Sequence, residues 1–440
     1  MKRFWVLAFV GAAVALALVR PVAVIDTQAE EARDGATFTR DVAPLLQQHC
    51  QECHRPGQIA PFALLSWEQA YSHRQKIGKV VTSRRMPPWK PVAGYGEFHG
   101  VRGLSATEIV TIESWVKAGA PQGNPDDLPA PRVFADAPPL GTPDLTLTAE
   151  VYTVPGQTGD IYRCLVVDNV FTETRYVTGV EFVPGNRKIV HHAIAYIDTS
   201  GYAVELDRRD PGPGYTCFGG PGFRAAGYLG GWTPGARPWV MPAGAGLEVP
   251  QGARLVFQMH YHNDNAQPET DASAIRLYFA REPIDRRVHF ARVIDTNVSI
   301  PAGAKRHELD ITWPVRRDME LIAIHPHMHL LGREMKVWAT LPDSRVVPLI
   351  YIDDWDFDWQ GFYFYRTPVR LAQGARIDLK AVWDNSADNP RNPNRPPQRV
   401  TWGERTTDEM GHAAILYTLD DERLTTGRSD ADHAPTVPSN

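Results

Sequence analysis

Apolar residues recur at helical spacing near the beginning of the chain. In "LSATEIVTIESWVKAGAP" they lie three or four positions apart, the period of a helix with one buried face. Ser105 followed by Glu108 forms a capping box at its start, and Gly119 before Pro121 marks its end. The apolar stripe consists of Ile109, Ile112, Trp115 and Val116. With a similar stripe in "TRDVAPLLQQHC", residues 36–123 are predicted to form a small all-α domain.

From about residue 144 the pattern changes to short segments typical of β-strands. "RYVTGVEFV", "KIVHHAIAYI", "ARLVFQMHYH" and "MELIAIHPHMHLL" are rich in β-branched and aromatic residues, and turn residues separate them. Regularly spaced short strands without a long helical pattern predict an all-β sandwich. Roughly 280 residues are long for one sandwich, so we divide the stretch into domains at 144–283 and 284–424.

The remaining segments have no periodicity that predicts a packed element. Residues 124–143 are rich in proline and are predicted to be a linker. The polar residues 425–440 are predicted to be a disordered tail.

The first residues are typical of an export signal. "MKR" precedes the 16-residue apolar run Phe4–Val19, which is shorter than the about 20 residues that span a membrane. A signal peptide over residues 1–29, cleaved after "TQA", fits this pattern. An uncleaved membrane anchor is the alternative, and in both cases the rest of the protein is expected in the periplasm or otherwise outside the cytoplasm.

Composition excludes one class of partner. The chain is 43% hydrophobic and 22% charged, as expected of a folded soluble protein, and its formal net charge is −5. No basic face or arginine-rich run is present, so nucleic acid is not an expected partner.

Export changes the interpretation of the four cysteines, because disulfides persist in oxidising compartments. Cys50 and Cys53 share one short motif, whereas Cys164 and Cys217 are alone in their regions and free to pair. A bridge between the latter two would close a loop of fifty-odd residues and stabilise the fold by about 3–4 kcal/mol.

The motif "CQECH", Cys50 to His54, has the C-x-x-C-H spacing of covalent haem attachment. Two thiols at this spacing can each form a thioether to a haem vinyl group, and the histidine becomes an axial iron ligand. Chance predicts about 0.001 such motifs in a chain of this composition. A stray disulfide or a zinc half-site is the alternative, but no second half lies nearby. The predicted helical domain therefore resembles a small cytochrome c that carries a c-type haem.

Met86 in "RRMPPW" is the candidate for the second axial ligand. It is the only methionine between residues 30 and 240, and methionine opposite histidine raises the haem potential, which suits electron transfer. In the alternative, Met86 packs in the core and His73 or His99 is the ligand.

Seven of the 15 histidines fall in three short strand-like stretches. These are "VHHAIA" (His191, His192), "QMHYHN" (His260, His262) and "HPHMHLLG" (His325, His327, His329). A solvated ladder of histidines is the simplest interpretation of one such stretch, but three in one all-β region favour a metal, and imidazole suits copper, zinc, iron and nickel. Adjacent residues of a regular strand face opposite ways. His191 and His192 can therefore share a metal only at a strand end or a distortion.

The order "VHH", "QMHY", "HMHLLGR" and "DEM" resembles the copper type II, ascorbate-dependent monooxygenases, the family of peptidylglycine α-hydroxylating monooxygenase and dopamine β-monooxygenase. The likeness extends over roughly residues 140–420 and includes "YRC", "MPAGAGLEV" and "TTDEM". It implies two all-β, jelly-roll-type sandwiches, each holding one copper across a wet cleft. With the all-α domain that resembles cytochrome c in front of them, the chain is expected to have a multidomain fold.

The resemblance also implies roles for individual residues. Cys164 and Cys217 match a family disulfide. The copper that passes electrons is matched by His191, His192 and His260. The copper that binds oxygen and performs catalysis is matched by His327, His329 and Met410. A thioether is soft and favours Cu(I), which makes zinc an unsuitable occupant of the second site.

Three positions depart from the peptide-hydroxylating enzymes. His325 stands where they carry an arginine that holds a substrate carboxylate, and His412 and Ala414 replace polar and tyrosine groups that help there. Peptide recognition is therefore not expected. His262 has no matched role and is interpreted as a solvated histidine.

These features predict an exported haem- and copper-dependent monooxygenase. It would hydroxylate a C–H bond of a small organic substrate with O₂, and a periplasmic donor would supply electrons through the fused cytochrome. The alternative is a non-catalytic haem and copper protein that transfers electrons or binds copper. A scaffold with decayed copper sites is a third possibility, against which six matching ligands argue. The aromatic, acidic segment "DDWDFDWQGFYFY" (353–365) either lies near the cleft or forms a core strand with an acidic turn.

Overall fold

The computed structural model describes residues 35–426, except residues 59, 135–137 and 234. The predicted signal peptide at 1–29 and residues 427–440 of the predicted tail lie outside the described residues. No helix among the described residues is long and apolar enough to cross a membrane. The described chain is mostly β-sheet with few helices.

The N-terminal part is helical and packs around its own core, in which Leu46 and Trp115 are fully buried. Its helices are the π-helix η1 (Phe38–Val42), α2 (Ala43–His49), α3 (Trp67–Thr82) and α4 (Ala106–Lys117). The predicted capping box at α4 is confirmed, because Ser105 Oγ accepts from the Glu108 N–H and Glu108 Oε2 accepts from the Ser105 N–H. The linker contains one short 3₁₀ turn, η2 (Pro125–Asp127).

A first β-sandwich follows the linker, and side chains from two sheets, such as Phe257 and Leu277, share its core. The six-stranded sheet runs in the order β1 (Leu145–Thr148), β12 (Ala274–Phe279), β4 (Arg175–Val183), β9 (Ala245–Val249) and β13 (Arg286–Arg287), with β8 (Trp239–Val240) also on β4. The five-stranded sheet runs in the order β6 (Tyr215–Thr216), β3 (Asp160–Val166), β10 (Arg254–His262), β5 (Val190–Asp198) and β7 (Gly227–Trp232). A two-stranded ribbon and a helix complete this part: β2 (Tyr152–Val154) with β11 (Glu269–Asp271), and α5 (Tyr202–Arg209).

The predicted disulfide between Cys164 and Cys217 is confirmed, with a Cα–Cα distance of 5.6 Å. It joins β3 to the segment after β6 and packs in a small cluster on the outer face of the five-stranded sheet, together with Tyr196 and Val256.

A second sandwich is built from two four-stranded sheets, and Trp383 and Ile415 lie in its core. One sheet runs in the order β14 (His289–Ile294), β23 (Gly411–Leu419), β17 (Met319–Met328) and β20 (Tyr363–Leu371). The other runs in the order β16 (His307–Pro314), β21 (Arg376–Trp383), β18 (Gly332–Thr340) and β19 (Val346–Ile352). A short pair, β15 (Ser299–Ile300) with β22 (Val400–Thr401), and a 3₁₀ turn, η3 (Leu424–Thr426), complete it.

The two sandwiches pack against each other through the outer faces of β17 and β23. Ala323 and Leu416, one from each of these strands, belong to the core cluster of the first sandwich. The Phe290 ring of β14 also contacts the Tyr228 ring of β7, with centroids 4.4 Å apart. The outer face of β17 and β23 therefore forms the interface between the two sandwiches.

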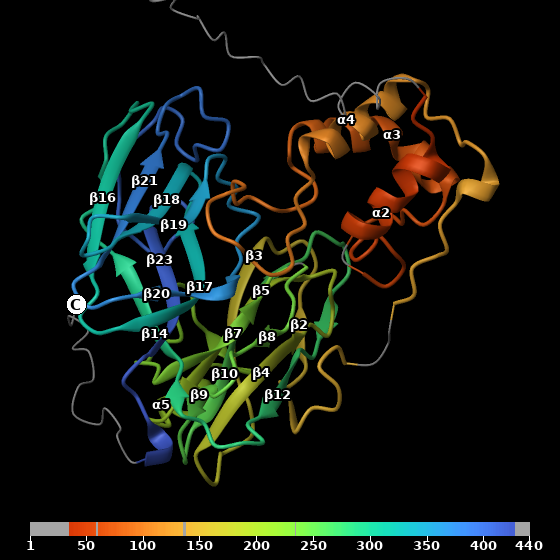
Figure 1. Cartoon of the computed structure of the whole chain (residues 1–440). Helices are drawn as coiled ribbons and strands as arrows, with labels where there is room; N and C mark the ends of the chain where they lie inside the picture. The colour runs from red at the N-terminus through yellow and green to blue at the C-terminus, as the bar shows by residue number, and fades with distance from the viewer. Residues whose placement is uncertain (1–34, 59, 135–137, 234, 427–440) are drawn as a thin grey trace, which may run out of the picture.

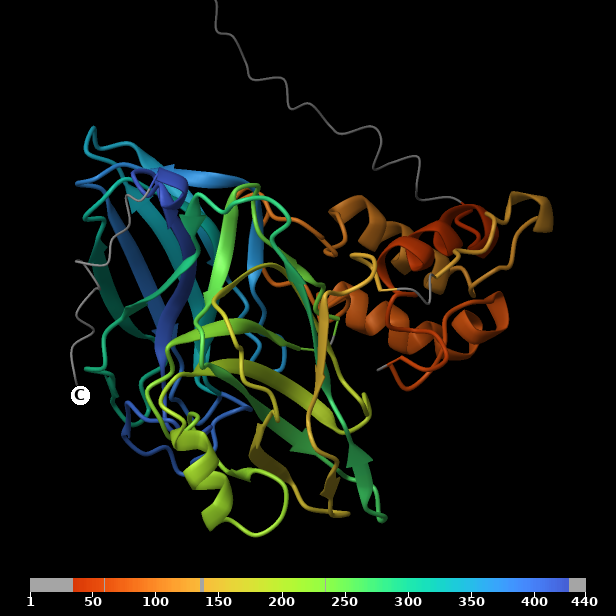
Figure 2. The same ribbon diagram turned by 90° about the horizontal axis from the view of Figure 1, so that it is seen from below.

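A strap, residues 86–104, runs from the helical part to the second sandwich (Figure 1). The Val92 N–H donates to the Tyr351 carbonyl of β19, and the His99 N–H donates to the Phe364 carbonyl of β20, both at 2.8 Å. The helices themselves lie to one side of the two sandwiches in both views (Figures 1 and 2). The strap therefore fixes the helical part against the β-sheet part by backbone hydrogen bonds.

Candidate metal centres

Three histidines converge at one end of the five-stranded sheet of the first sandwich. His192 Nδ1 lies 3.3 Å from His191 Nδ1 and 3.1 Å from His260 Nδ1. One ring nitrogen from each residue lies within 4.8 Å of the others, which makes this a group that can hold a metal ion. The structure thus brings together the three residues that the sequence predicted as one copper site.

A β-bulge explains how two adjacent histidines reach the same point. His192 pairs with His260, but the next residue of β10, Tyr261, pairs with Val190. His191 is therefore an extra residue on β5, and a bulge turns the side chains of neighbouring residues toward one side of the sheet. This is the distortion that the sequence required for a shared metal.

The spacing and charge state of this three-histidine group fit a metal ion. Metal–imidazole bonds of about 2.0 Å at tetrahedral angles separate the nitrogens by about 3.3 Å, close to the observed distances. Burial lowers the pKa of both His191 and His192, and the neighbouring imidazoles lower it further. The rings are therefore neutral near pH 7, and each keeps a nitrogen lone pair for a metal.

Asp160, at the start of β3, contacts the ring nitrogen of His260 that points away from the centre of this group. Its Oδ1 lies 3.1 Å from His260 Nε2 and 2.9 Å from His262 Nδ1. The His260 imidazole beside it is the largest cause that lowers the pKa of Asp160, and the contact is a close approach and not an aligned hydrogen bond. Because Nε2 of His260 faces a carboxylate, its Nδ1 is left free to bind a metal. His262 is half-buried and also lies 3.0 Å from Asp264, at the edge of the group.

A second group of histidines lies on β17, on the face turned toward the first sandwich. Ile324 and Met328 point into the core of the second sandwich, so the alternating residues His325 and His327 point the other way. His329 follows the last residue of the strand, and its ring centroid lies 5.1 Å from that of His327.

The rings of His327 and His329 are each held through Nδ1. His327 Nδ1 lies 2.6 Å from Gln360 Oε1, and His329 Nδ1 lies 3.1 Å from the Asp408 carbonyl oxygen. A nitrogen that donates to such an acceptor leaves the Nε2 lone pair for a metal, which is the usual arrangement of metal-binding histidines. Burial lowers the pKa of both residues, so both rings are neutral near pH 7.

Met410 is buried immediately before β23, and its neighbour Glu409 ties this strand to the end of β17. Glu409 accepts hydrogen bonds from the His329 and Leu331 backbone N–H groups and from Trp383 Nε1. Burial raises the pKa of this carboxyl to about 8. Continued by one pair past the end of β17, the register between β17 and β23 brings His329 opposite Met410.

His325 lies between the two histidine groups. Its ring stacks on Phe362 with centroids 4.6 Å apart, and Phe362 in turn contacts the Trp239 ring of the first sandwich at 4.4 Å. Burial lowers the pKa of His325 to about 4, and its charge would lower the pKa of His192. The two groups therefore face one another across an interface that aromatic rings fill at this level.

Segment 353–365 combines the two alternatives left by the sequence, because its middle lies beside the second group and its end, Tyr363 and Tyr365, forms part of a core strand. It contributes Gln360 to His327 and the edge of Phe357 to His329, at a centroid distance of 5.9 Å. It also contributes Phe362, and its last residues begin β20.

The C-x-x-C-H motif forms a tight turn directly after α2. The His54 N–H donates to the Cys50 carbonyl at 2.9 Å, and neither Cys50 nor Cys53 is in a disulfide. His54 Nδ1 lies 3.0 Å from the Phe62 carbonyl oxygen, which leaves Nε2 for an axial bond to iron. Burial raises the pKa of Cys50 to about 12, so this thiol is protonated at neutral pH. The donor set of the motif fits a covalent haem.

The three candidates for the second axial ligand have different surroundings. Met86 is half-buried after α3, where its N–H donates to the Val80 carbonyl. The His73 ring stacks on Phe62 at 3.9 Å, and His99 is exposed on the strap beside β20. No contact in the described residues joins Met86 to His54, and Met86 stays a prediction.

The haem motif lies against the first sandwich near the three-histidine group. Arg102 Nη1 donates to the Gly235 carbonyl at 2.9 Å, and a side chain at Gly235 would lie 3.6 Å from Cys53 Sγ. Gly235 follows β7 by three residues, and the last residue of β7, Trp232, pairs with Ala193 next to His192. The loop after β7 therefore links Cys53 to the strand that carries the histidines.

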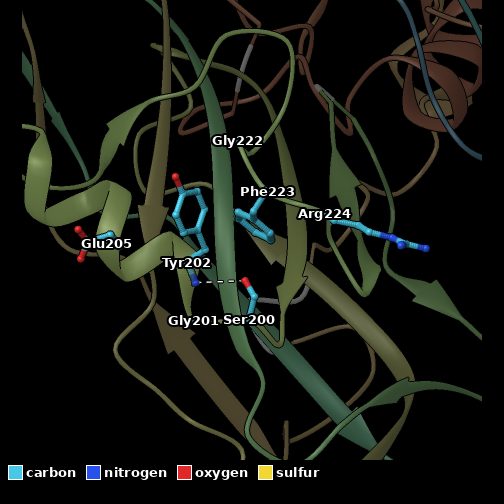
Figure 3. A pocket seen from close by; sticks show the side chains of 7 residues that line it. All are labelled: Ser200, Gly201, Tyr202, Glu205, Gly222, Phe223 and Arg224. Atoms are coloured by element: carbon cyan, nitrogen blue, oxygen red, sulfur yellow. Dashed lines mark hydrogen bonds between the residues drawn. The ribbon is translucent and has the colours of Figure 1, made fainter. Parts of the chain in front are cut away.

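A hollow of 550 Å³ lies at the other end of β5 (Figure 3). Its lining includes Ser200, Tyr202 and Phe223, and the Tyr202 N–H donates to Ser200 Oγ at 3.1 Å. At about 3.3 Å per residue, Ser200 lies roughly 25 Å along the sheet from His192. This hollow is therefore remote from both histidine groups.

Sequence reasoning missed the residues that orient the histidines. Asp160, Gln360 and Glu409 lie far along the chain from the rings or backbone groups they hold, and no spacing rule links them. The "DEM" motif contained Glu409 but gave it no role.

The chain has a distant relative among curated proteins. A human protein named DBH-like monooxygenase protein 1 is 23% identical over 310 residues, which cover 63% of this chain and 45% of that protein. The chain therefore spans less than half of this relative's length. The similarity agrees with the family resemblance of the histidine motifs. No protein-family model matches the chain.

Solved structures give only weak similarities. The VP2 subviral particle of infectious bursal disease virus is 7% identical, with 62% of this chain and 71% of that chain covered and a TM-score of 0.18. A structure of PNGF-II is 8% identical, with 63% and 65% covered and a TM-score of 0.27. Scores of this size carry no argument about the fold or the function.

Proposed function

We propose that this protein is an exported copper-dependent monooxygenase that hydroxylates a C–H bond of a small organic molecule. The observation that carries the proposal is the pair of partly buried histidine groups on the two sandwiches. In the first group three ring nitrogens lie within 4.8 Å of one another, and in the second Nδ1 of His327 and of His329 is held by an acceptor, which leaves Nε2 free. The distant similarity to a protein named a monooxygenase supports the same class. The disulfide supports export, because such bonds persist in oxidising compartments.

Two copper ions and one c-type haem are the proposed cofactors. His191, His192 and His260 would hold one copper, and His327, His329 and Met410 would hold the other. Cys50, Cys53 and His54 would hold the haem, with Met86 as the second axial ligand. Bound copper supplies one-electron redox chemistry and, as Cu(I), reactivity toward O₂.

The residues of the chain orient and shield these sites. Gln360 and the Asp408 carbonyl fix the rings of His327 and His329, while Phe362 and Trp239 exclude water from the interface beside them. The overall reaction takes one C–H compound, one O₂, two electrons and two protons to one alcohol and one water. A periplasmic one-electron donor would supply the electrons through the haem-binding part, a role supported by the contact between its motif and the loop after β7.

The ring contacts at the sandwich interface favour an alternative function, electron transfer without catalysis. The rings of His325 and Phe362 are stacked, and Phe362 makes a tilted contact with the Trp239 ring of the first sandwich, at the interface where the family resemblance implies a wet cleft. A packed interface suits a non-catalytic haem and copper protein that only transfers electrons. Substrate-dependent uptake of O₂ by the reduced protein, with one alcohol formed per O₂, would exclude this alternative.

The first test is the copper-to-haem ratio of protein matured in a periplasm. We expect two coppers per haem in the unmodified protein and loss or weakening of one in Met410→Ala, because the thioether ligand is removed. Met241→Ala is the matched control, since Met241 is 6% exposed and Met410 is 4% exposed, and it should keep both coppers. One copper or none in the unmodified protein would contradict the proposal.

A further inference from the structure

His412 has an unpaired nitrogen beside the proposed oxygen-binding site. It lies on β23 directly opposite His327 of β17, and the two ring centroids are 4.9 Å apart. The side chain is 8% exposed, and its Nδ1 is buried with no hydrogen-bond partner among the described residues. Buried polar groups in native structures nearly always have a partner, so the unpaired nitrogen requires an explanation.

The neighbouring histidines lack this feature. His327 and His329 each have Nδ1 beside an acceptor, at 2.6 Å and 3.1 Å. In the three-histidine group, the centroid of His192 lies 4.6 Å from that of His260, a separation similar to that of His327 and His412. The His327–His412 pair thus has the ring spacing of the group that already fits a metal.

Sheet register places four donor groups in one patch. His327 and His412 form one cross-strand pair, and the register of the last pair, Met328 with Gly411, continued by one residue brings His329 opposite Met410. Opposite side chains of an antiparallel pair have Cβ atoms about 4.5–5.5 Å apart. His412 therefore lies on the strand beside His327 and His329. Among the described residues only the three-histidine group has one ring nitrogen of each member within 4.8 Å of the others, so shared binding by His327, His329 and His412 requires their rings to turn toward one another.

We propose that His412 is a third imidazole ligand of the copper held by His327, His329 and Met410. This inference rests on the proposed function, because it assumes copper at that site. The site would then offer three nitrogens and one sulfur. Imidazole suits Cu(II) better than a thioether does, so a third imidazole stabilises Cu(II) relative to Cu(I). His412 would lower the reduction potential of this copper.

The test uses the full-length protein with His260→Ala, which leaves only the second site able to bind copper firmly. Cu(II) is added, and the electron paramagnetic resonance spectrum, Cu(II) affinity and copper reduction potential are measured with and without His412→Gln. We expect the spectrum to show couplings from three imidazole nitrogens when His412 is present and from two in His412→Gln. We expect this substitution to weaken Cu(II) binding by about tenfold or more. We expect the reduction potential to rise. His412→Asn is a second variant should His412→Gln not fold.

His307→Gln is the matched control. His307 lies on β16 of the same sandwich, and its ring contacts Trp383 at a centroid distance of 6.0 Å. It should leave all three measurements unchanged. Identical two-nitrogen spectra with and without His412→Gln would overturn the proposal while leaving the second copper site in place. Absence of copper from the His260→Ala protein would instead overturn the second copper site, and with it the proposed function.

Discussion

At the scale of single residues, the candidate sites share one arrangement of imidazole hydrogen bonds. One ring nitrogen of His54, His327 and His329 lies beside a carbonyl or amide oxygen, and the other is left free. In His260 the two ring nitrogens exchange roles: Nε2 lies beside Asp160, and Nδ1 lies at the centre of the three-histidine group. Such outer partners fix the tautomer and the orientation of metal ligands.

Asp160 tests this arrangement at the three-histidine group. Asp160→Asn removes the negative charge beside His260 Nε2, so we expect copper affinity at this group to fall about 10- to 100-fold. Copper titration of the purified protein measures it. Asp264→Asn is the control, because Asp264 contacts His262 but not His260, and it should bind copper normally. Equal affinities in the two variants would show that Asp160 does not orient His260.

At the scale of elements, irregular strand features position the histidines. The bulge at His191 brings two adjacent rings to one side of β5. On β17 the register shifts between Leu321 and Ala323, ahead of the outward-facing His325 and His327. Glu409 then joins the end of β17 to the start of β23 through two hydrogen bonds, and a third ties it to Trp383 of β21. A regular strand would not bring His191 and His192 to one side, whereas regular alternation is sufficient for His325 and His327.

Substitution of Glu409 tests how this carboxyl holds the strand ends together. Glu409→Ala leaves three buried N–H donors without this acceptor, so we expect the free energy of unfolding to fall by about 3 kcal/mol or more. Denaturant unfolding and copper titration check the result. Copper binding at the second site should weaken while the three-histidine group keeps its affinity. Glu409→Gln retains one acceptor oxygen and similar volume, and it should be less destabilised. The prediction is wrong if the alanine and glutamine variants unfold alike.

At the scale of the whole molecule, two interfaces connect the three parts of the chain. Ala323 and Leu416 join the second sandwich to the core of the first. The strap and the contact between Arg102 and Gly235 join the helical part to both sandwiches. Burial lowers the pKa of Arg102, but the nearby Cys53 thiol opposes this shift. The C-x-x-C-H turn is thus held at a defined place on the first sandwich.

Gly235 tests the contact between the helical part and the first sandwich. Gly235 has a φ of +79°, and a Cβ there would collide with Arg102 Nη1. Gly235→Ala should displace the guanidinium and remove a charged hydrogen bond that contributes about 1.5–3 kcal/mol. Hydrogen–deuterium exchange of peptides containing Arg102 or Gly235 should increase, and reduction of the bound copper by a one-electron donor should slow.

Gly252→Ala is the matched control for Gly235→Ala. Gly252 has a similar φ of +82°, but a Cβ there would meet nothing within 4 Å. Both variants carry the same backbone strain, so only the collision with Arg102 distinguishes them. If both variants behave alike, the contact between Arg102 and Gly235 does not hold the helical part in place.

Local sequence was sufficient where the physics is local. The C-x-x-C-H turn, the capping box of α4 and the apolar period of its stripe depend on residues within a few positions of each other, and these features appear as expected. The candidate donor atoms of His191, His260 and Met410 could likewise be predicted from the sequence, because imidazole and thioether chemistry belongs to the side chain itself. The pairing of Cys164 with Cys217 followed from there being no other isolated cysteines.

Folding determined what depends on distant partners. The rings of His260 and His327 are oriented by Asp160 and Gln360, and a one-residue bulge decides that His191 and His192 share a side of the sheet. Register between β17 and β23 brings His412 opposite His327, although 85 positions separate them in the chain. Such contacts arise from strand pairing and core packing, which no local spacing encodes. The sequence therefore carried the chemistry of the donors, and the pairing of the sheets determined which donors meet.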